Sequence, residues 1–138
     1  MTSDPHDTVR RWLEAANRFD LGYIAANATA DIRSTMHSFG IDTQGKEAFL
    51  ESTKAVWQAL PDRRFHIQSM ISTGTTVIAE VSCTATSPGG RDYLPPTGQP
   101  MTLDLCMIFS IRDRLISKER VYFDPGAPTT GPSAPPQP

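Results

Sequence analysis

The sequence of 138 residues lacks several features that mark common functional classes. It has no long run of Lys and Arg, and a net charge of -2 gives no excess of positive charge to attract nucleic acid. The two arginine pairs, Arg10-Arg11 and Arg63-Arg64, are expected at the solvated ends of elements. No apolar stretch approaches the roughly 18 residues of a membrane span, and the polar N-terminus has no signal segment. We therefore expect a cytoplasmic protein that binds neither nucleic acid nor membrane.

Motifs for metals, phosphates and covalent catalysis are also missing. The histidines show no His-x-His or His-Glu-x-x-His spacing, and the two cysteines form no Cys-x-x-Cys pair. Cys83 and Cys106 lie in apolar, strand-like runs, which favours buried structural thiols. The glycines of residues 87–90 lack the lysine and the helix start of a phosphate-binding loop. These absences favour chemistry with no metal and no other cofactor.

The composition changes near the C-terminus. Six of the 12 prolines lie from Pro125 onward, and residues 126–138 contain no charge and no large apolar side chain. Such a segment cannot offset its ordering entropy by burial. We predict one domain over residues 1–125 and a disordered tail over residues 126–138.

The order of hydrophobic periods predicts the fold class. Helical spacing occurs in residues 5–19, in a short segment after Asp20, and in residues 45–60, which Pro61 ends. A brief strand is expected at 32–37, and the period is two in residues 64–71, 77–85, 101–111 and 115–123. Helices followed by strands with short turns are typical of α+β proteins. We predict a cone-shaped, curved antiparallel sheet packed against three N-terminal helices.

Three strings resemble the SnoaL-like polyketide cyclases of the nuclear transport factor two-like superfamily. They are Leu60-Pro61-Asp62 after the third helix, Thr97-Gly98-Gln99 before a strand, and Ile116 followed eight residues later by Asp124. The resemblance covers about residues 5–125. It implies a cone with an internal apolar pocket, and an aldol ring closure in which Asp124 is the general acid/base. In the last strand the chain departs from the pattern, because Glu119 is one place late and Arg120 stands where Trp is common. The resemblance therefore does not specify the substrate.

A second resemblance is to the ketosteroid isomerases. The string Met36-His37-Ser38-Phe39-Gly40 matches the turn that carries their base, so the resemblance implies that role for His37. A histidine that titrates near pH 6.5 suits general-base work. The two donors that stabilise their enolate fall at Trp12 and Met107, and a thioether cannot donate a hydrogen bond. Steroid isomerisation by that mechanism is therefore not expected.

Each candidate also has a simpler structural interpretation. His37 is equally compatible with a surface loop, and Asp124 with the start of an Asp-Pro turn. Asp104 and Glu80 are further acid/base candidates, although alternation places Asp104 opposite the apolar odd-numbered face and leaves Glu80 ambiguous. A β-bulge would reverse either placement. Large apolar side chains are expected to line the pocket or fill the core: Trp12, Met36, Phe39, Trp57, Met107, Phe109 and Phe123.

The leading functional prediction is a cofactor-independent acid/base enzyme. It would be a cyclase or isomerase for a hydrophobic, polyketide-like or terpenoid-like molecule that bears a carbonyl, with His37 and Asp124 exchanging the proton. One alternative is a non-catalytic module for small-molecule binding or dimerisation. Another is an epoxide hydrolase or dehydratase, which needs Asp104 or Glu80 to face inward beside Asp124. The resemblance also implies a homodimer.

Overall fold

The computed structural model describes residues 4–124, which form helices and one six-stranded sheet. The helices are α1 (Pro5–Asn17), α2 (Leu21–Ala26), α3 (Lys46–Ala59) and the 3-10 turn η1 (His37–Phe39). The strands are β1 (Ala28–Met36), β2 (Ile41–Gln44), β3 (Arg64–Thr73), β4 (Thr76–Thr86), β5 (Pro100–Arg112) and β6 (Leu115–Tyr122). The predicted α+β class is confirmed. The prediction for residues 38–44 is wrong in part, because they were expected to form a loop and contain β2, and β1 begins at Ala28 rather than at the expected residue 32. The expected tail, residues 126–138, lies outside the described residues, and the expected division at residue 125 stays a prediction.

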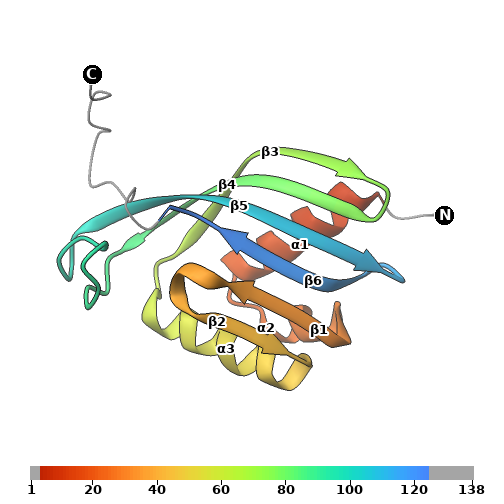
Figure 1. Cartoon of the computed structure of the whole chain (residues 1–138), viewed down its shortest axis with the longest axis horizontal. Helices are drawn as coiled ribbons and strands as arrows, with labels where there is room; N and C mark the ends of the chain where they lie inside the picture. Colours follow the sequence, from red (N-terminus) through yellow and green to blue (C-terminus); the bar gives the residue numbers. More distant parts are fainter. Residues whose placement is uncertain (1–3, 125–138) are drawn as a thin grey trace.

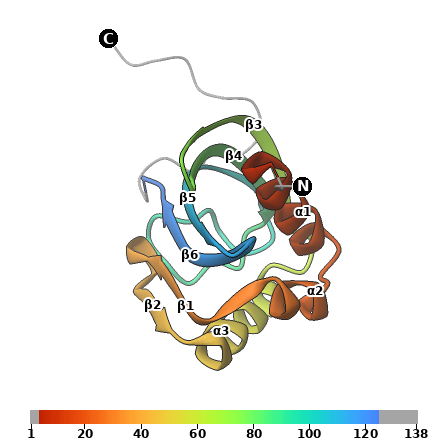
Figure 2. The same cartoon turned by 90° about the vertical axis from the view of Figure 1, so that its right-hand side faces the viewer.

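The sheet is strongly curved, and the helices lie along its concave side (Figures 1 and 2). Its strand order is β2-β1-β6-β5-β4-β3. Helix α1 packs on β3 and β4, and α3 packs on β1 and β2. Within residues 4–124, no helix combines the length and the apolar character needed to cross a membrane.

One strand pair differs from the antiparallel sheet that the sequence predicts. Strand β1 runs parallel to β6, whereas the other neighbouring pairs are antiparallel. The backbone N–H of Ile116, near the start of β6, donates to the carbonyl of Asn27, just before β1, at 2.9 Å. The two strands therefore begin side by side and run in the same direction. No hairpin joins these strands, and a long connection leaves either direction available. The sheet is therefore mixed.

Local signals in the sequence set the helix ends. The Asp4 carboxylate caps α1 by accepting from the backbone N–H of His6 at 2.9 Å, and Pro5 occupies the first turn. Helix α3 ends at Ala59 before Pro61. Asp62 then accepts hydrogen bonds from the backbone N–H (2.9 Å) and the hydroxyl (2.5 Å) of Thr86. These bonds lower the pKa of Asp62 and join the end of α3 to the end of β4.

Alternation along β4 and β5 places their odd-numbered side chains on the concave face. These residues are buried, and they form about half of the core: Val77, Ala79, Val81, Cys83, Ala85, Met101, Leu103, Leu105, Met107 and Phe109. Asp104 and Glu80 lie on the opposite face and are exposed. Glu80 accepts a hydrogen bond from the Ser69 hydroxyl at 2.8 Å. Alternation in the sequence thus gave the correct face for Asp104, and the structure places Glu80, whose face the sequence left ambiguous, on the outer face.

Strand β6 contains a bulge that changes which side chains face inward. Ile111 pairs with Ile116 and Ser110 pairs with Lys118, so Ser117 is an extra residue without a partner across the strands. The Ser117 hydroxyl donates to the carbonyl of Ser110 at 3.1 Å. An extra residue reverses the alternation beyond it. From the bulge onward the odd-numbered residues of β6 therefore point to the concave side.

Candidate functional site

Two adjoining chambers lie between the helices and the concave face of the sheet. The inner chamber has a cavity volume of about 90 Å³, and the outer chamber about 390 Å³. They share part of their lining: Met36, Ile41, Ser52, Val56, Arg63, Phe65 and Leu105. The outer volume falls in the range of roughly 300–1,000 Å³ that is usual for small-ligand sites. The inner chamber has room for one functional group or a few waters, given about 30 Å³ for a water molecule.

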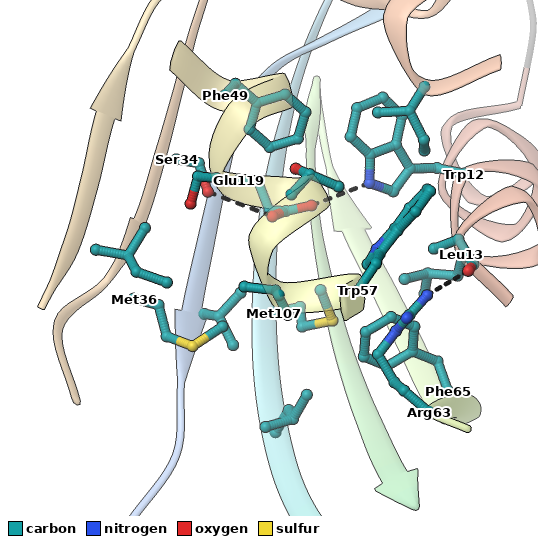
Figure 3. Close-up of a pocket in the computed structure, with 18 residues that line it drawn as sticks. Trp12, Leu13, Ser34, Met36, Phe49, Trp57, Arg63, Phe65, Met107 and Glu119 are labelled. Carbon is teal, nitrogen blue, oxygen red and sulfur yellow. Dashed lines mark hydrogen bonds between the residues drawn. The ribbon is translucent and has the colours of Figure 1, made fainter. Parts of the chain in front are cut away.

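The inner chamber contains a carboxyl group that three separate elements hold in place. Glu119 on β6 accepts a hydrogen bond from the indole Nε1 of Trp12 on α1 at 3.0 Å. Its other oxygen accepts from the hydroxyl of Ser34 on β1 at 3.4 Å. Both bonds are drawn in Figure 3, where the carboxyl points into the space between the helices and the sheet. Both oxygens are therefore oriented by the protein.

The surroundings of Glu119 change its acidity. Burial raises the pKa of Glu119 above its ordinary value, and the hydrogen bonds from Trp12 and Ser34 oppose part of that rise. The net direction is upward, because apolar walls stabilise the charged form less than water does. A raised pKa brings a carboxyl group closer to the pH at which it can both accept and donate a proton.

Aromatic packing fixes the Trp12 donor. The Trp12 ring stacks on Phe49 of α3 with centroids 5.9 Å apart and planes at 21°. Trp12 is 2% exposed and Phe49 is 3% exposed. The indole N–H is thus aimed at Glu119 before any ligand binds, so no side-chain entropy is lost in placing it during a reaction.

Arg63, at the junction of the two chambers, lines both of them. The sequence predicts a solvated end for the pair Arg63-Arg64, and for Arg63 this prediction is wrong, because that residue is 1% exposed. Its Nη2 donates to the carbonyl of Ala16 in the last turn of α1. Burial lowers the pKa of Arg63.

The two predicted catalytic residues do not line either chamber. His37 begins η1 and is exposed, because β1 ends at Met36 and the inward position falls on Met36 itself. Asp124 is also exposed; Phe123, one residue earlier, lines the outer chamber. Neither residue therefore lines the chamber that contains Glu119.

Six of the seven predicted pocket residues do line a chamber. Trp12, Trp57 and Met107 line the inner one, Phe39 and Phe123 the outer one, and Met36 both. The Phe39 and Phe123 rings meet with centroids 5.0 Å apart. Phe109 is the exception, because it is completely buried in the core and lines neither chamber.

Sequence analysis missed Glu119, Ser34 and Arg63 as site residues. For Glu119 the sequence contained a signal, because this acidic residue stands one place late relative to the cyclase pattern. The structure has a one-residue bulge at Ser117, and such a bulge reverses the face of the later residues in the strand. Ser34 lies in a polar strand segment without a clear alternation. Within the described residues, no group of three or more His, Cys, Asp or Glu is arranged to hold a metal ion.

Comparison with known proteins gives consistent findings. The sequence model of the SnoaL-like domain family matches residues 9–119. No curated protein matches by sequence.

Among solved structures, IdmH, a candidate polyketide cyclase from Streptomyces antibioticus, is similar with a TM-score of 0.75 and 22% identity, over 88% of this chain and 93% of that one. An LEH-like epoxide hydrolase from M. tuberculosis gives 0.70 and 18%, over 87% and 82%. A protein from Catenulispora acidiphila with a ketosteroid isomerase-like fold gives 0.71 and 16%, over 83% of both chains. At these identities the likeness shows the shared fold.

Proposed function

Because this chain belongs to the SnoaL-like domain family, we propose that it is an acid/base enzyme for a hydrophobic, carbonyl-bearing small molecule, with Glu119 as the proton carrier. One observation carries this proposal. Glu119 is the only carboxyl group among the described residues that line a largely apolar chamber, and a side chain on another element holds each of its oxygens. A buried carboxyl of this kind, in a cleft large enough for a ligand, is typical of a functional site.

The chemistry follows from the ionisation of Glu119. Its carboxylate would take a proton from the carbon next to the substrate carbonyl, which leaves an enolate. In an isomerisation, the same group returns the proton to a different carbon. In a ring closure, the enolate carbon attacks a second carbonyl of the substrate and protonated Glu119 supplies the proton to the new alkoxide. The raised pKa makes Glu119 a stronger base than a solvated carboxylate, and it keeps the protonated form present at higher pH than for a solvated carboxyl group.

The two chambers would divide the work of binding. The inner chamber, about 90 Å³, suits the reacting end of the molecule, and the outer chamber, about 390 Å³, suits its apolar body. Holding a flexible chain in one folded conformation supplies part of the rate enhancement. Well-oriented intramolecular reactions gain about 7–11 kcal/mol in this way. The likeness to the candidate cyclase IdmH supports ring closure as the concrete form.

Epoxide opening by paired carboxylates has less support. Among the described residues that line the chambers, Glu119 is the only carboxylate. Asp104 and Glu80, which this alternative requires at the pocket, are exposed on the outer face of the sheet. We therefore favour proton exchange at a carbon next to a carbonyl. The homodimer stays a prediction, because the structure contains one chain.

The test uses trans-2-decalone, a bicyclic ketone with exchangeable protons beside its carbonyl. In D₂O, the wild-type protein should accelerate the exchange of these protons, which 1H NMR follows directly. Glu119→Gln should slow the catalysed exchange by about 10²–10⁴-fold, the usual contribution of a general acid/base. Glu14→Gln, which removes an exposed carboxylate from α1, is the matched control and should leave the rate unchanged.

Two results would count against the proposal. If Glu119→Gln keeps the wild-type rate, another group carries the proton. If decalone binds to the wild-type protein but its protons do not exchange faster than in buffer, the non-catalytic binding module is the better account.

A further inference from the structure

Arg63 is a buried cation whose charge has no carboxylate partner among the described residues. It lies between α3 and β3 and is 1% exposed, although it lines both chambers. None of the ion pairs found in residues 4–124 includes it. Buried charges in proteins are normally paired, because their removal from water is otherwise uncompensated. The position of Arg63 therefore needs an explanation beyond packing.

The hydrogen bonds of Arg63 are also incomplete. A guanidinium has five N–H donors and cannot accept. Nη2 donates to the carbonyl of Ala16, but Nε and Nη1 are buried and have no partner in the described chain. An unmade hydrogen bond at a buried charged group is strongly unfavourable. Two unsatisfied donors on one side chain that lines a cavity indicate a place for an acceptor in that cavity.

Aromatic rings surround the guanidinium and hold it in place. Its central carbon lies 4.6 Å from the centroid of the Phe19 ring, 5.2 Å from Trp57 and 5.1 Å from Phe65. These contacts stabilise the cation in the absence of a counter-ion. Figure 3 shows the Arg63 side chain beside Trp57 and Phe65, in the same chamber as Glu119. A cation in such surroundings attracts an anionic oxygen more strongly than it would in water.

We propose that Arg63 is the anion-binding subsite of the cavity, and that the natural ligand is an apolar molecule with a carboxylate group. The carboxylate would accept hydrogen bonds from Nε and Nη1, which have no partner in the protein. One extension rests on the proposed function as well. If that function is correct, the substrate is a hydrophobic keto acid. Its carboxylate would lie at Arg63 and its reacting carbonyl near Glu119.

A purely structural role explains only part of this geometry. The bond to the Ala16 carbonyl places a positive charge at the C-terminal end of α1, which is favourable for a helix. That bond leaves Nε and Nη1 unused. A structural role also predicts no preference for an anionic ligand over a neutral ligand of the same shape.

The experiment compares 2-naphthoate with 2-acetonaphthone, in which a methyl group replaces one carboxylate oxygen. Binding is measured by titration calorimetry at about pH 7.5, where a carboxylic acid is ionised. We expect wild-type protein to bind the naphthoate at least about tenfold more tightly, the low end of what a hydrogen bond to a charged group contributes. Arg63→Gln should abolish that preference. Arg64→Gln, a change at the exposed neighbouring arginine, should retain it.

A second readout needs no folded variant of Arg63. In a 1H–15N spectrum of the wild-type side chains, the Arg63 Nε–H signal should move on addition of naphthoate and stay in place with acetonaphthone. Arg63→Lys, which keeps the charge, should retain a reduced preference for the carboxylate. Equal binding of the two probes by wild-type protein would overturn the proposal, and so would an Arg63 signal that naphthoate does not move.

These outcomes are separable from those of the Glu119 test. A preference for naphthoate together with unchanged proton exchange in Glu119→Gln would leave the anion subsite standing and remove the acid/base role. Equal binding of the two probes together with slowed proton exchange in Glu119→Gln would support the acid/base role and rule out a keto acid as the substrate.

Discussion

The hydrogen bond from Trp12 to Glu119 makes a prediction about stability that depends on pH. Trp12→Phe removes the indole N–H, which donates to the Glu119 carboxyl at 3.0 Å, and keeps an aromatic ring against Phe49. The lost bond matters most when Glu119 is charged. A hydrogen bond to a charged group contributes about 1.5–3 kcal/mol, and one between neutral groups about 0.5–1.5 kcal/mol. The variant should therefore lose about 1–1.5 kcal/mol more at high pH than at low pH, in addition to a constant loss from packing.

The direction follows from proton linkage. The folded state already binds the Glu119 proton more tightly than the unfolded state, because burial raises the pKa of Glu119 above its ordinary 4.5. Stability from this group is present below pH 4.5 and falls as the pH rises through the raised folded-state pKa. Trp12→Phe raises that pKa further, so its loss of stability relative to wild type grows as the pH rises from the folded-state pKa of wild type to that of the variant. A difference of about 1.4 kcal/mol corresponds to a tenfold change in proton affinity.

Urea unfolding of wild type and variant at a series of pH values measures this difference. The same substitution in a Glu119→Gln background is the control, since no charge can form there and the pH-dependent part should vanish. A Trp12→Phe loss of stability that is constant across pH would show that the bond does not depend on the charge of Glu119. So would an equal pH dependence in the Glu119→Gln background.

Three further predictions concern the same residues and their supports. Glu119→Gln should raise the free energy of unfolding relative to wild type at pH 8 and lose this advantage below pH 4.5, because the wild-type cost of burying the charge is absent in acid; thermal unfolding at both pH values checks this. Ser34→Ala should change the Glu119 titration less than Trp12→Phe does, because the Ser34 bond is 3.4 Å long against 3.0 Å; an equal or larger effect would contradict it. Asp62→Ala should lower the free energy of unfolding by about 1–2 kcal/mol at neutral pH, because the two bonds from Thr86 are lost. The loss should be smaller in acid, because the lowered pKa of Asp62 means that its charged form stabilises the fold, and this stabilisation disappears as Asp62 is protonated. Urea unfolding at pH 7 and pH 3 decides the last of these.

Periodicity predicted the parts of this molecule in which the backbone is regular. The alternation of β5 gave its buried face and the outward direction of Asp104. Helical spacing predicted one apolar stripe from Val9, Trp12, Leu13, Ala16 and Phe19; the first four are buried on α1, but Phe19 follows the helix and is 39% exposed. These features depend only on a fixed period of side-chain direction.

The site itself depends on departures from that period. Glu119 reaches the cavity because Ser117 is inserted into β6, and a pattern of apolar residues does not locate a bulge. Arg63 is buried through contacts with Phe19, which is distant from it in sequence, and with Trp57, which lies on α3. Composition predicts a solvated arginine at such a place, and only tertiary packing overrides that expectation.

The proposed function depends most directly on Glu119 being a carboxyl group of raised pKa in a largely apolar chamber. Carbon-13 NMR of the glutamate side-chain carboxyls, with Glu119 assigned by the signal that Glu119→Gln removes, measures its pKa in the folded protein directly. We expect a titration midpoint above the ordinary 4.5, shifted by ligands that fill the chamber. A midpoint at or below 4.5 would contradict it.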